Sequence, residues 1–197
     1  QSLIGNANIY MTMIGDPAQF YKPNKENSSL EKYAASIGKP VEELTELDKT
    51  NFRVAQAEDT FINIDGIGIY GSPWSPIYGM WAFMKHRNTE MYEVWEQVPT
   101  DGSVDILVTH TPAWGRNDIS VRGNLHVGCE MLANKLSVIN PKVHVCGHIH
   151  ECGGKIVEES FGPISLNASL LNEYYVLAHP IWIWDTETND WETISKK

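Results

Sequence analysis

The chain has 197 residues, a mass of 22.2 kDa and a formal net charge of −10 at pH 7. Its length fits a single domain, and a content of 42% hydrophobic residues is typical of a protein that buries a core. An acidic chain lacks the basic surface that binding to a nucleic acid polymer requires, so that class of partner is excluded. No apolar run approaches the roughly 18 residues that span a bilayer, so we expect no membrane association.

The cysteine content and the first residues bear on location and on domain organisation. Three cysteines, an odd number, argue against a disulfide framework and for a reducing compartment. Together with the absence of a visible signal peptide, they predict a cytoplasmic location. The chain opens at Gln1 without an initiator Met, and its first apolar residues resemble the end of a strand. Either the chain was processed or it is part of something longer, and we expect residues 1–197 to form one unit.

The first third of the chain predicts a loop followed by helices. Residues 16–27 are rich in Pro, Asn and Lys, which is typical of a surface loop. Ser28 or Ser29 is a suitable N-cap for a helix whose apolar residues recur at helical spacing up to Ile37. Pro40 fits the first turn of a further helix.

The middle of the chain predicts a hairpin, a rigid loop and a helix. Alternating isoleucines flank the dipeptide Asp65-Gly66, which favours a two-residue hairpin turn. Residues 71–76 contain two prolines and predict a loop without ladder pairing. Apolar residues at helical spacing from Met91 to Val98 predict an amphipathic helix.

The remainder of the chain predicts a mixture of strands and helices. Short apolar runs at 104–108 and 143–146 are typical of buried strands, and a helix from Cys129 to Ile139 separates them. Further strands are predicted at 156–158, 164–167 and 181–185. This succession predicts an α/β fold with mixed sheets.

Polar side chains with metal-binding chemistry follow three of the strand-like segments. His110 follows one buried strand, His148 and His150 follow another, and Asn6 follows the segment that opens the chain. Taken singly, each histidine is more often structural than a ligand. In open α/β sheets, however, ligands gather beyond the carboxyl ends of the strands. Because imidazole binds Mn, Zn and Fe and an amide oxygen can join it, the joint pattern predicts a metal site.

The order of these motifs resembles the calcineurin-like metallophosphoesterases, and within them the metallophosphoesterase-domain (MPPED) phosphodiesterases. The resemblance extends well over residues 50–185. The matching segments are Tyr70-Gly-Ser-Pro-Trp-Ser-Pro76, Asp105-Ile-Leu-Val-Thr-His-Thr-Pro112, Val127-Gly-Cys129, His144-Val-Cys-Gly-His-Ile-His-Glu151 and Leu166-Asn-Ala-Ser169. It implies an α/β sandwich of two mixed β-sheets flanked by helices, of which residues 1–197 would form the C-terminal part without the first strands.

The resemblance also implies a two-metal site. The family's residues that match Asn6, His110 and His148 bind one ion, and the residue that matches His150 binds the other. Two ions about 3.5–4 Å apart clamp a phosphoryl group and generate a hydroxide for in-line attack. The implied activity is metal-dependent hydrolysis of a small phosphodiester, such as a cyclic nucleotide, with Mn, Zn or Fe as the metal. The ions would also supply the positive charge that the acidic chain lacks.

Two departures from the family pattern bear on activity. The Asp-x-His and Gly-Asp motifs that precede Gly-Asn-His in the family are missing, since Gly15-Asp16 comes after Asn6 and fits a turn. Ala7 stands where the family has a His that assists phosphate binding or protonates the leaving group, so no catalytic residue is assigned. The alternative is a catalytically impaired or truncated relative, with one metal or none, that acts as a protein-binding scaffold. With either function, a sheet without its first strands leaves an exposed edge, so we predict that a partner segment or self-association completes the sheet.

Other residues near these motifs are weaker candidates. Trp74 and Trp114 could stack on a planar substrate ring, with loop packing as the alternative. Arg116 could bind a phosphate, with a solvated side chain as the alternative. Other histidines have no spacing that recruits them to a site: His86, His126, His144 and His179. The cysteines fit buried thiols, with a soft metal ligand as the alternative for Cys152.

Overall fold

A computed structural model describes residues 8–11, 40–43, 59–80, 83–121, 123–158 and 162–194. The predicted loop and helix before Pro40 lie outside the described residues, as do Asn6 and Ala7. Pro40 itself begins a short turn, η1 (Val41–Glu43), in which the Glu43 amide donates to the Pro40 carbonyl at 3.0 Å.

The remaining elements follow in chain order. The described strands are β1 (Asn8–Met11), β2 (Thr60–Ile64), β3 (Ile67–Ser72), β4 (Ser75–Pro76), β5 (Met84–Lys85), β6 (Ile106–Thr109), β7 (Ile119–Ser120), β8 (Leu125–His126), β9 (Val143–Cys146), β10 (Ile156–Val157), β11 (Ile164–Asn167), β12 (Ile181–Asp185) and β13 (Trp191–Ile194). The described helices are α4 (Thr89–Glu96) and α5 (Glu130–Ile139), with a 3₁₀ turn η2 (His150–Cys152) between β9 and β10. Neither described helix has the length and apolar character needed to cross a membrane.

Six strands form the central sheet in the order β10-β11-β9-β6-β3-β2. The four inner strands run parallel to one another, and the edge strands β2 and β10 run antiparallel to their neighbours. Because β3, β6, β9 and β11 are parallel, their carboxyl ends meet at one edge of the sheet. The segments that follow these strands are therefore brought together although they are distant in the sequence.

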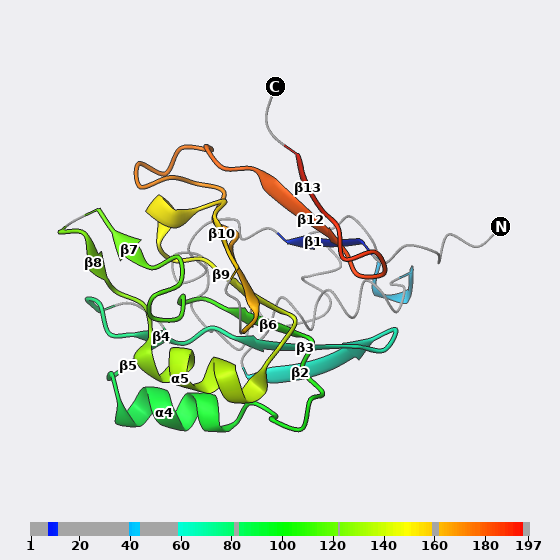
Figure 1. The fold of residues 1–197 in the computed structure, drawn as a ribbon, viewed down its shortest axis with the longest axis horizontal. Coiled ribbons are helices and arrows are strands. Elements are labelled where there is room, and N and C mark those ends of the chain that lie inside the picture. Colours follow the sequence, from blue (N-terminus) through cyan, green and yellow to red (C-terminus); the bar gives the residue numbers. More distant parts are fainter. Residues whose placement is uncertain are drawn as a thin grey trace.

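A second sheet and two helices cover the faces of the central sheet. Strands β1, β12 and β13 form an antiparallel sheet on one face, while α4 and α5 pack on the other (Figure 1). The predicted sandwich of two sheets with helices outside is confirmed. Among the described strands, however, only the central sheet is mixed.

Two apolar clusters hold the three layers together. Leu107 of β6 packs with Leu132 of α5 on the helical side of the central sheet. Its neighbour Ile106 packs with Val143 and Trp184 between the two sheets. The change of side from one residue to the next is the two-residue period of a strand, and both sides are covered, which explains why β6 and β9 are largely buried.

The predicted hairpin is confirmed in its position and its turn. Strands β2 and β3 are joined by Asp65 and Gly66, which have positive φ angles of 51° and 90°. Two positive φ angles define the primed turn that a two-residue hairpin needs, and Gly66 accepts its angle without strain. The Asn63 side chain also accepts a hydrogen bond from the Gly66 amide at 3.0 Å.

The two-residue strands β4, β5, β7 and β8 were not predicted. The prediction of an unpaired loop over 71–76 is wrong, because β4 pairs with β5. The Ser75 amide donates to Phe83 and the Ile77 amide donates to Lys85, so the missing N–H of Pro76 falls between two ladder bonds. The strands β7 and β8 have two residues each, which is too short for any pattern to indicate a strand.

Removal of the Trp184 side chain is expected to destabilise the packing between the sheets. Trp184 is 2% exposed and stacks on Trp191 with ring centroids 5.7 Å apart. We expect Trp184→Ala to lower the free energy of unfolding by about 3–5 kcal/mol in a urea titration. Trp114→Ala, which removes a 42% exposed side chain, is the matched control and should cost far less. Equal losses in the two variants would contradict this account of the core.

Candidate metal centre

The loops that carry the predicted histidines begin at the carboxyl ends of two neighbouring parallel strands. β6 pairs with β9, with Leu107 opposite His144. The ladder continues beyond the strands, because the Gly147 amide donates to the His110 carbonyl at 3.1 Å. On the other side, the His110 amide donates to the carbonyl of Ser72 at 3.1 Å. The backbone at His110 is thus fixed between both neighbours.

The side chains of His110 and His148 meet at this edge. Their ring centroids lie 4.6 Å apart with an interplanar angle of 59°. His110 is 7% exposed, and its pKa is lowered to about 3 because burial disfavours the imidazolium, with smaller effects from His148 and His150. His110 is therefore a neutral imidazole at physiological pH, which is the form that binds metal ions.

The loop that carries His148 has an unusual backbone held by a buried side chain. His148 has a φ of 64°, a left-handed conformation that non-glycine residues rarely adopt. The Asn167 amide nitrogen donates to the carbonyls of Gly147 and Ile149, at 3.3 and 2.9 Å, on either side of His148. Asn167 is fully buried and its side-chain oxygen accepts from the Ser169 amide. Such retained strain is typical of functional loops.

His150 is oriented by a main-chain carbonyl. Its Nδ1 lies 3.1 Å from the carbonyl oxygen of Asn172. A carbonyl only accepts, so Nδ1 donates this hydrogen bond, and the second ring nitrogen of metal-binding histidines typically makes such a bond. His179 supports the same turn, because its Nε2 donates to the His150 carbonyl at 3.1 Å. No pattern in the sequence indicates this role of His179.

A chain of buried hydrogen bonds crosses the helical face of the central sheet and ends beside His110. Thr109 donates its hydroxyl proton to the Thr111 carbonyl at 2.6 Å, so it accepts from Nε2 of His144 at 2.8 Å. The other ring nitrogen of His144, Nδ1, then accepts from the Ser165 hydroxyl at 3.5 Å, at the outer limit of such a bond. Ser165 in turn accepts from Arg116 at 3.3 Å. The neutral His144 thereby links β11 to the end of β6.

Arg116 takes part in this chain instead of reaching the histidines. Its Nη1 also donates to the Pro163 carbonyl at 2.9 Å. Pro163 precedes β11, whereas His110 and His148 follow the far ends of the strands parallel to it. These contacts place part of the guanidinium near the start of β11, and the contact of Arg116 with phosphate stays a prediction.

The two predicted substrate-stacking tryptophans differ in their surroundings. The indole of Trp74 donates to Asp59 at 2.8 Å, and the Lys85 ammonium lies 4.4 Å from the centre of its ring. These contacts match the alternative of loop packing. Trp114 is 42% exposed and lies at 37° to the ring of His126, with centroids 5.3 Å apart. Trp114 is therefore the tryptophan that stays available to a ligand.

Asp118 is a structural residue that the sequence analysis did not single out. Its carboxylate is buried, with one oxygen 2.7 Å from Nδ1 of His126 and the other accepting from the Gly128 amide at 3.0 Å. These contacts close the segment between His110 and α5. No local pattern indicates them, because each depends on the path of the whole loop.

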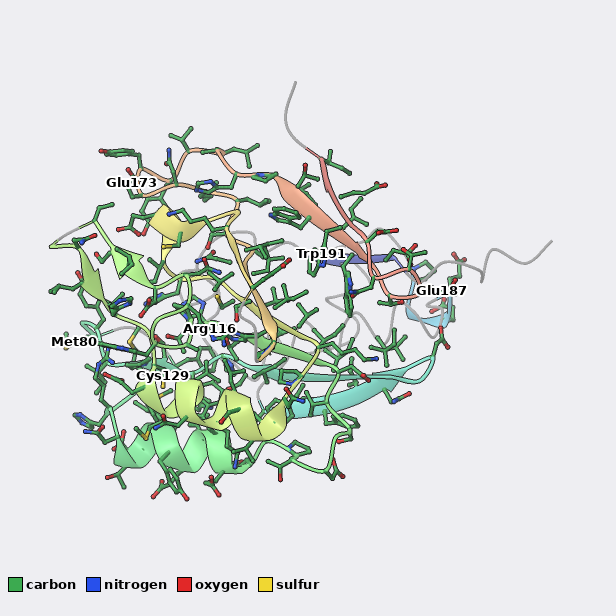
Figure 2. The ribbon with its side chains drawn as sticks, viewed as in Figure 1. Met80, Arg116, Cys129, Glu173, Glu187 and Trp191 are labelled. Carbon is green, nitrogen blue, oxygen red and sulfur yellow. The ribbon has the colours of Figure 1, made fainter. Side chains whose placement is uncertain are left out.

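The cysteines are free thiols with contacts inside the fold. Cys129 is the N-cap of α5, and its Sγ accepts from the Leu132 amide and from the indole of Trp95 (Figure 2 labels Cys129 above α4). Cys152 donates weakly to the Ile119 carbonyl at 3.5 Å, and burial raises its pKa. Both match the predicted buried thiols. The soft-ligand alternative for Cys152 has no support among these contacts.

The donor set fits a divalent ion in part. The rings of His110 and His148 are adjacent, and the hydrogen bond of His150 uses Nδ1, so Nε2 is its nitrogen that could face an ion. Within the described ranges, no group of three or more His, Cys, Asp and Glu side chains is arranged to hold an ion. Asn6, the predicted further ligand, lies outside those ranges.

Comparison with known proteins shows which proteins this chain is similar to. Metallophosphoesterase domain-containing protein 1 of Homo sapiens is 34% identical over 132 residues, which is 66% of this chain and 39% of that protein. A UPF0046 protein of Caenorhabditis elegans is 42% identical over 95 residues, 48% of this chain and 23% of that protein. No family model matches the chain. The resemblance to the metallophosphoesterase-domain group is confirmed, and the chain spans 23% to 39% of the length of these relatives.

A solved structure supports the fold independently. It superposes with a TM-score of 0.53 at 15% identity, and the match includes 89% of this chain and 78% of that structure. At this identity the match bears on the fold alone.

The buried His144 is expected to make the stability of the protein depend on pH. Burial, with a smaller effect from Arg116, lowers its pKa to about 3, whereas an unfolded histidine titrates near 6.5. The unfolded chain thus binds more protons, and the stability present above pH 6.5 is lost as the pH falls toward 3. We expect the contribution of His144 to be about 2 kcal/mol between pH 7 and pH 5.

The variant His144→Gln can keep the hydrogen bond to Thr109 but cannot titrate. Urea unfolding of both proteins at pH 7, 6 and 5 measures the difference. The free energy of unfolding should fall less steeply in the variant than in the native protein. The same slope in both would show that His144 is not held neutral by the fold.

Proposed function

We propose that this chain, a relative of the metallophosphoesterase domain-containing proteins, takes part in metal-dependent hydrolysis of a small phosphodiester, such as a cyclic nucleotide. The relatives support a phosphoesterase in general, and the choice of a diester is our own. The observation that carries the proposal is the contact between the His110 and His148 rings beyond the ends of adjacent parallel strands.

The histidines are the groups that would hold the ions. We assign His110 and His148 to one ion, together with Asn6, and His150 to a second. Neutral imidazoles with an amide oxygen suit Mn, Zn or Fe better than Ca or Mg. A divalent ion held there would polarise a phosphoryl oxygen and lower the pKa of bound water. The role of the protein is to fix the ligands, through Asn167 for the His148 loop and Asn172 for His150.

A protein-binding scaffold is the second candidate function. It is favoured by the absence, within the described ranges, of a third ligating side chain beside His110 and His148. In that case we propose that a partner segment or a second copy pairs with an edge of the central sheet, at β2 or β10. The chain would then keep the fold of its relatives but would not hydrolyse a phosphoester.

We also propose a cytoplasmic location. The support for this is that all three cysteines of the chain are free thiols: Cys129, Cys146 and Cys152. Free thiols are typical of a reducing compartment.

Metal content and turnover test the proposed activity. We expect the protein, after incubation with Mn and desalting, to retain Mn by elemental analysis and to hydrolyse bis(4-nitrophenyl) phosphate. His148→Ala removes one of two adjacent imidazoles, so we expect at least a tenfold loss of metal affinity and of turnover. His86→Ala removes an exposed imidazole elsewhere and serves as the matched control.

The two candidate functions predict different outcomes. Retention of less than about a tenth of an equivalent of Mn, Zn or Fe, with no turnover above the His148→Ala level, would contradict the hydrolase and favour the scaffold. Metal that raises the melting temperature without turnover would indicate a structural site on His110 and His148.

A further inference from the structure

The segment between β11 and β12 contains a tight loop next to His150. The carbonyl of Asn172 accepts two hydrogen bonds, one from Nδ1 of His150 at 3.1 Å and one from the Tyr175 amide at 2.9 Å. The position of Tyr175 is therefore coupled to that of the histidine through one shared oxygen. Figure 2 labels Glu173 at the outer end of this loop.

The loop holds Tyr175 in a strained conformation. Tyr175 has a φ of 60°, in the left-handed region that bulky residues avoid. The Asn172 side-chain oxygen accepts from the amides of Tyr174 and Val176, at 3.0 and 3.1 Å, on both sides of Tyr175. The Asn172 amide donates to the Val176 carbonyl at 2.9 Å. Four hydrogen bonds thus fix a tyrosine where glycine or asparagine would be easier to accommodate.

The ring of Tyr175 lies beside His150 and yet remains accessible. The two ring centroids are 5.1 Å apart at an angle of 70°, so the rings meet edge to face. The residue is 53% exposed, so much of its surface is available to a ligand. A residue that only supported His150 would gain from full burial and would not need a strained backbone.

We propose that Tyr175 determines substrate specificity, by packing its ring against a planar aromatic group of a phosphoester bound at the histidines. This inference rests on the proposed function and specifies the substrate class. An aromatic ring next to a phosphate site contributes no charge, so it discriminates between organic groups and does not bind the phosphate itself. Base–aromatic stacking of this kind tolerates different ring systems.

The surroundings of the loop favour a ligand with an apolar face. Beside Tyr175, the residues Val176 and Leu177 are 58% and 49% exposed. On the neighbouring loop, Trp114 is 42% exposed, and the strand β7 that follows it packs against η2, which contains His150. Exposed apolar side chains therefore lie on two loops next to the histidine edge.

Ligand binding tests this role without dependence on turnover. Isothermal titration calorimetry compares phenyl phosphate with methyl phosphate, both in the presence of Mn. Tyr175→Asn removes the ring but suits the left-handed backbone, and Tyr175→Phe retains the ring. Tyr174→Asn, at a 76% exposed neighbour, is the matched control.

We expect the native protein to prefer phenyl phosphate, and Tyr175→Asn to weaken phenyl phosphate binding about tenfold while methyl phosphate changes less than twofold. Tyr175→Phe and Tyr174→Asn should bind as the native protein does. Equal affinity of the native protein for both ligands, or an equal loss for both in Tyr175→Asn, would overturn the specificity role and leave the phosphoester site intact. Binding of neither ligand by the native protein would also overturn the specificity role, and only together with no turnover of bis(4-nitrophenyl) phosphate would it overturn the proposed function itself.

Discussion

The parallel pairing of β6 with β9 is the constraint on which the site depends. Neighbouring strands in a sheet lie about 4.8 Å apart, so the residues that leave two parallel strands at the same level start at that separation. The rings of His110 and His148 are 4.6 Å apart. The hydrogen bond from Gly147 to His110 extends the ladder to the first residue of each loop. Strand pairing therefore brings together two loops that are distant in the sequence, and the left-handed backbone of His148, held by Asn167, completes the meeting of the two rings.

Strand pairing only brings the two histidine loops close together, and buried polar side chains then fix their conformation. A buried donor or acceptor left unsatisfied costs about 1–3 kcal/mol. Only a few conformations of the surrounding chain can therefore satisfy the hydrogen-bonding groups of Asn167 and His144. Asn167 reaches the main chain on both sides of His148, and His144 connects Ser165 to Thr109. Both side chains lie on strands of the central sheet, so the histidine loops are supported by its most rigid part. The same strands thus form the core and hold the histidine loops in place.

The sequence predicted those features that depend on local pattern. The hairpin at Asp65-Gly66 and the buried strand β9 follow from turn chemistry and apolar runs, and the placement of His110 and His148 after strands was enough to expect that they meet. The roles of Arg116 and Tyr175 could not be predicted in this way. The Arg116 partner Pro163 is 47 positions away, and the importance of Tyr175 comes from a backbone angle and a carbonyl shared with His150. Partners that are distant in the sequence become visible only when the path of the chain is known.

The charge of the chain links the proposed binding of a metal ion to the proposed binding of the substrate phosphate. The chain has a net charge of −10, and phosphate is an anion, so phosphate binding at the histidine edge needs a local source of positive charge. Arg116, the cation that the sequence suggested for this purpose, donates instead to Pro163 and Ser165. We propose that a divalent ion held by the imidazoles supplies this charge. On this proposal, metal and phosphate would bind at the same site, and Tyr175 would contact the organic part of the substrate.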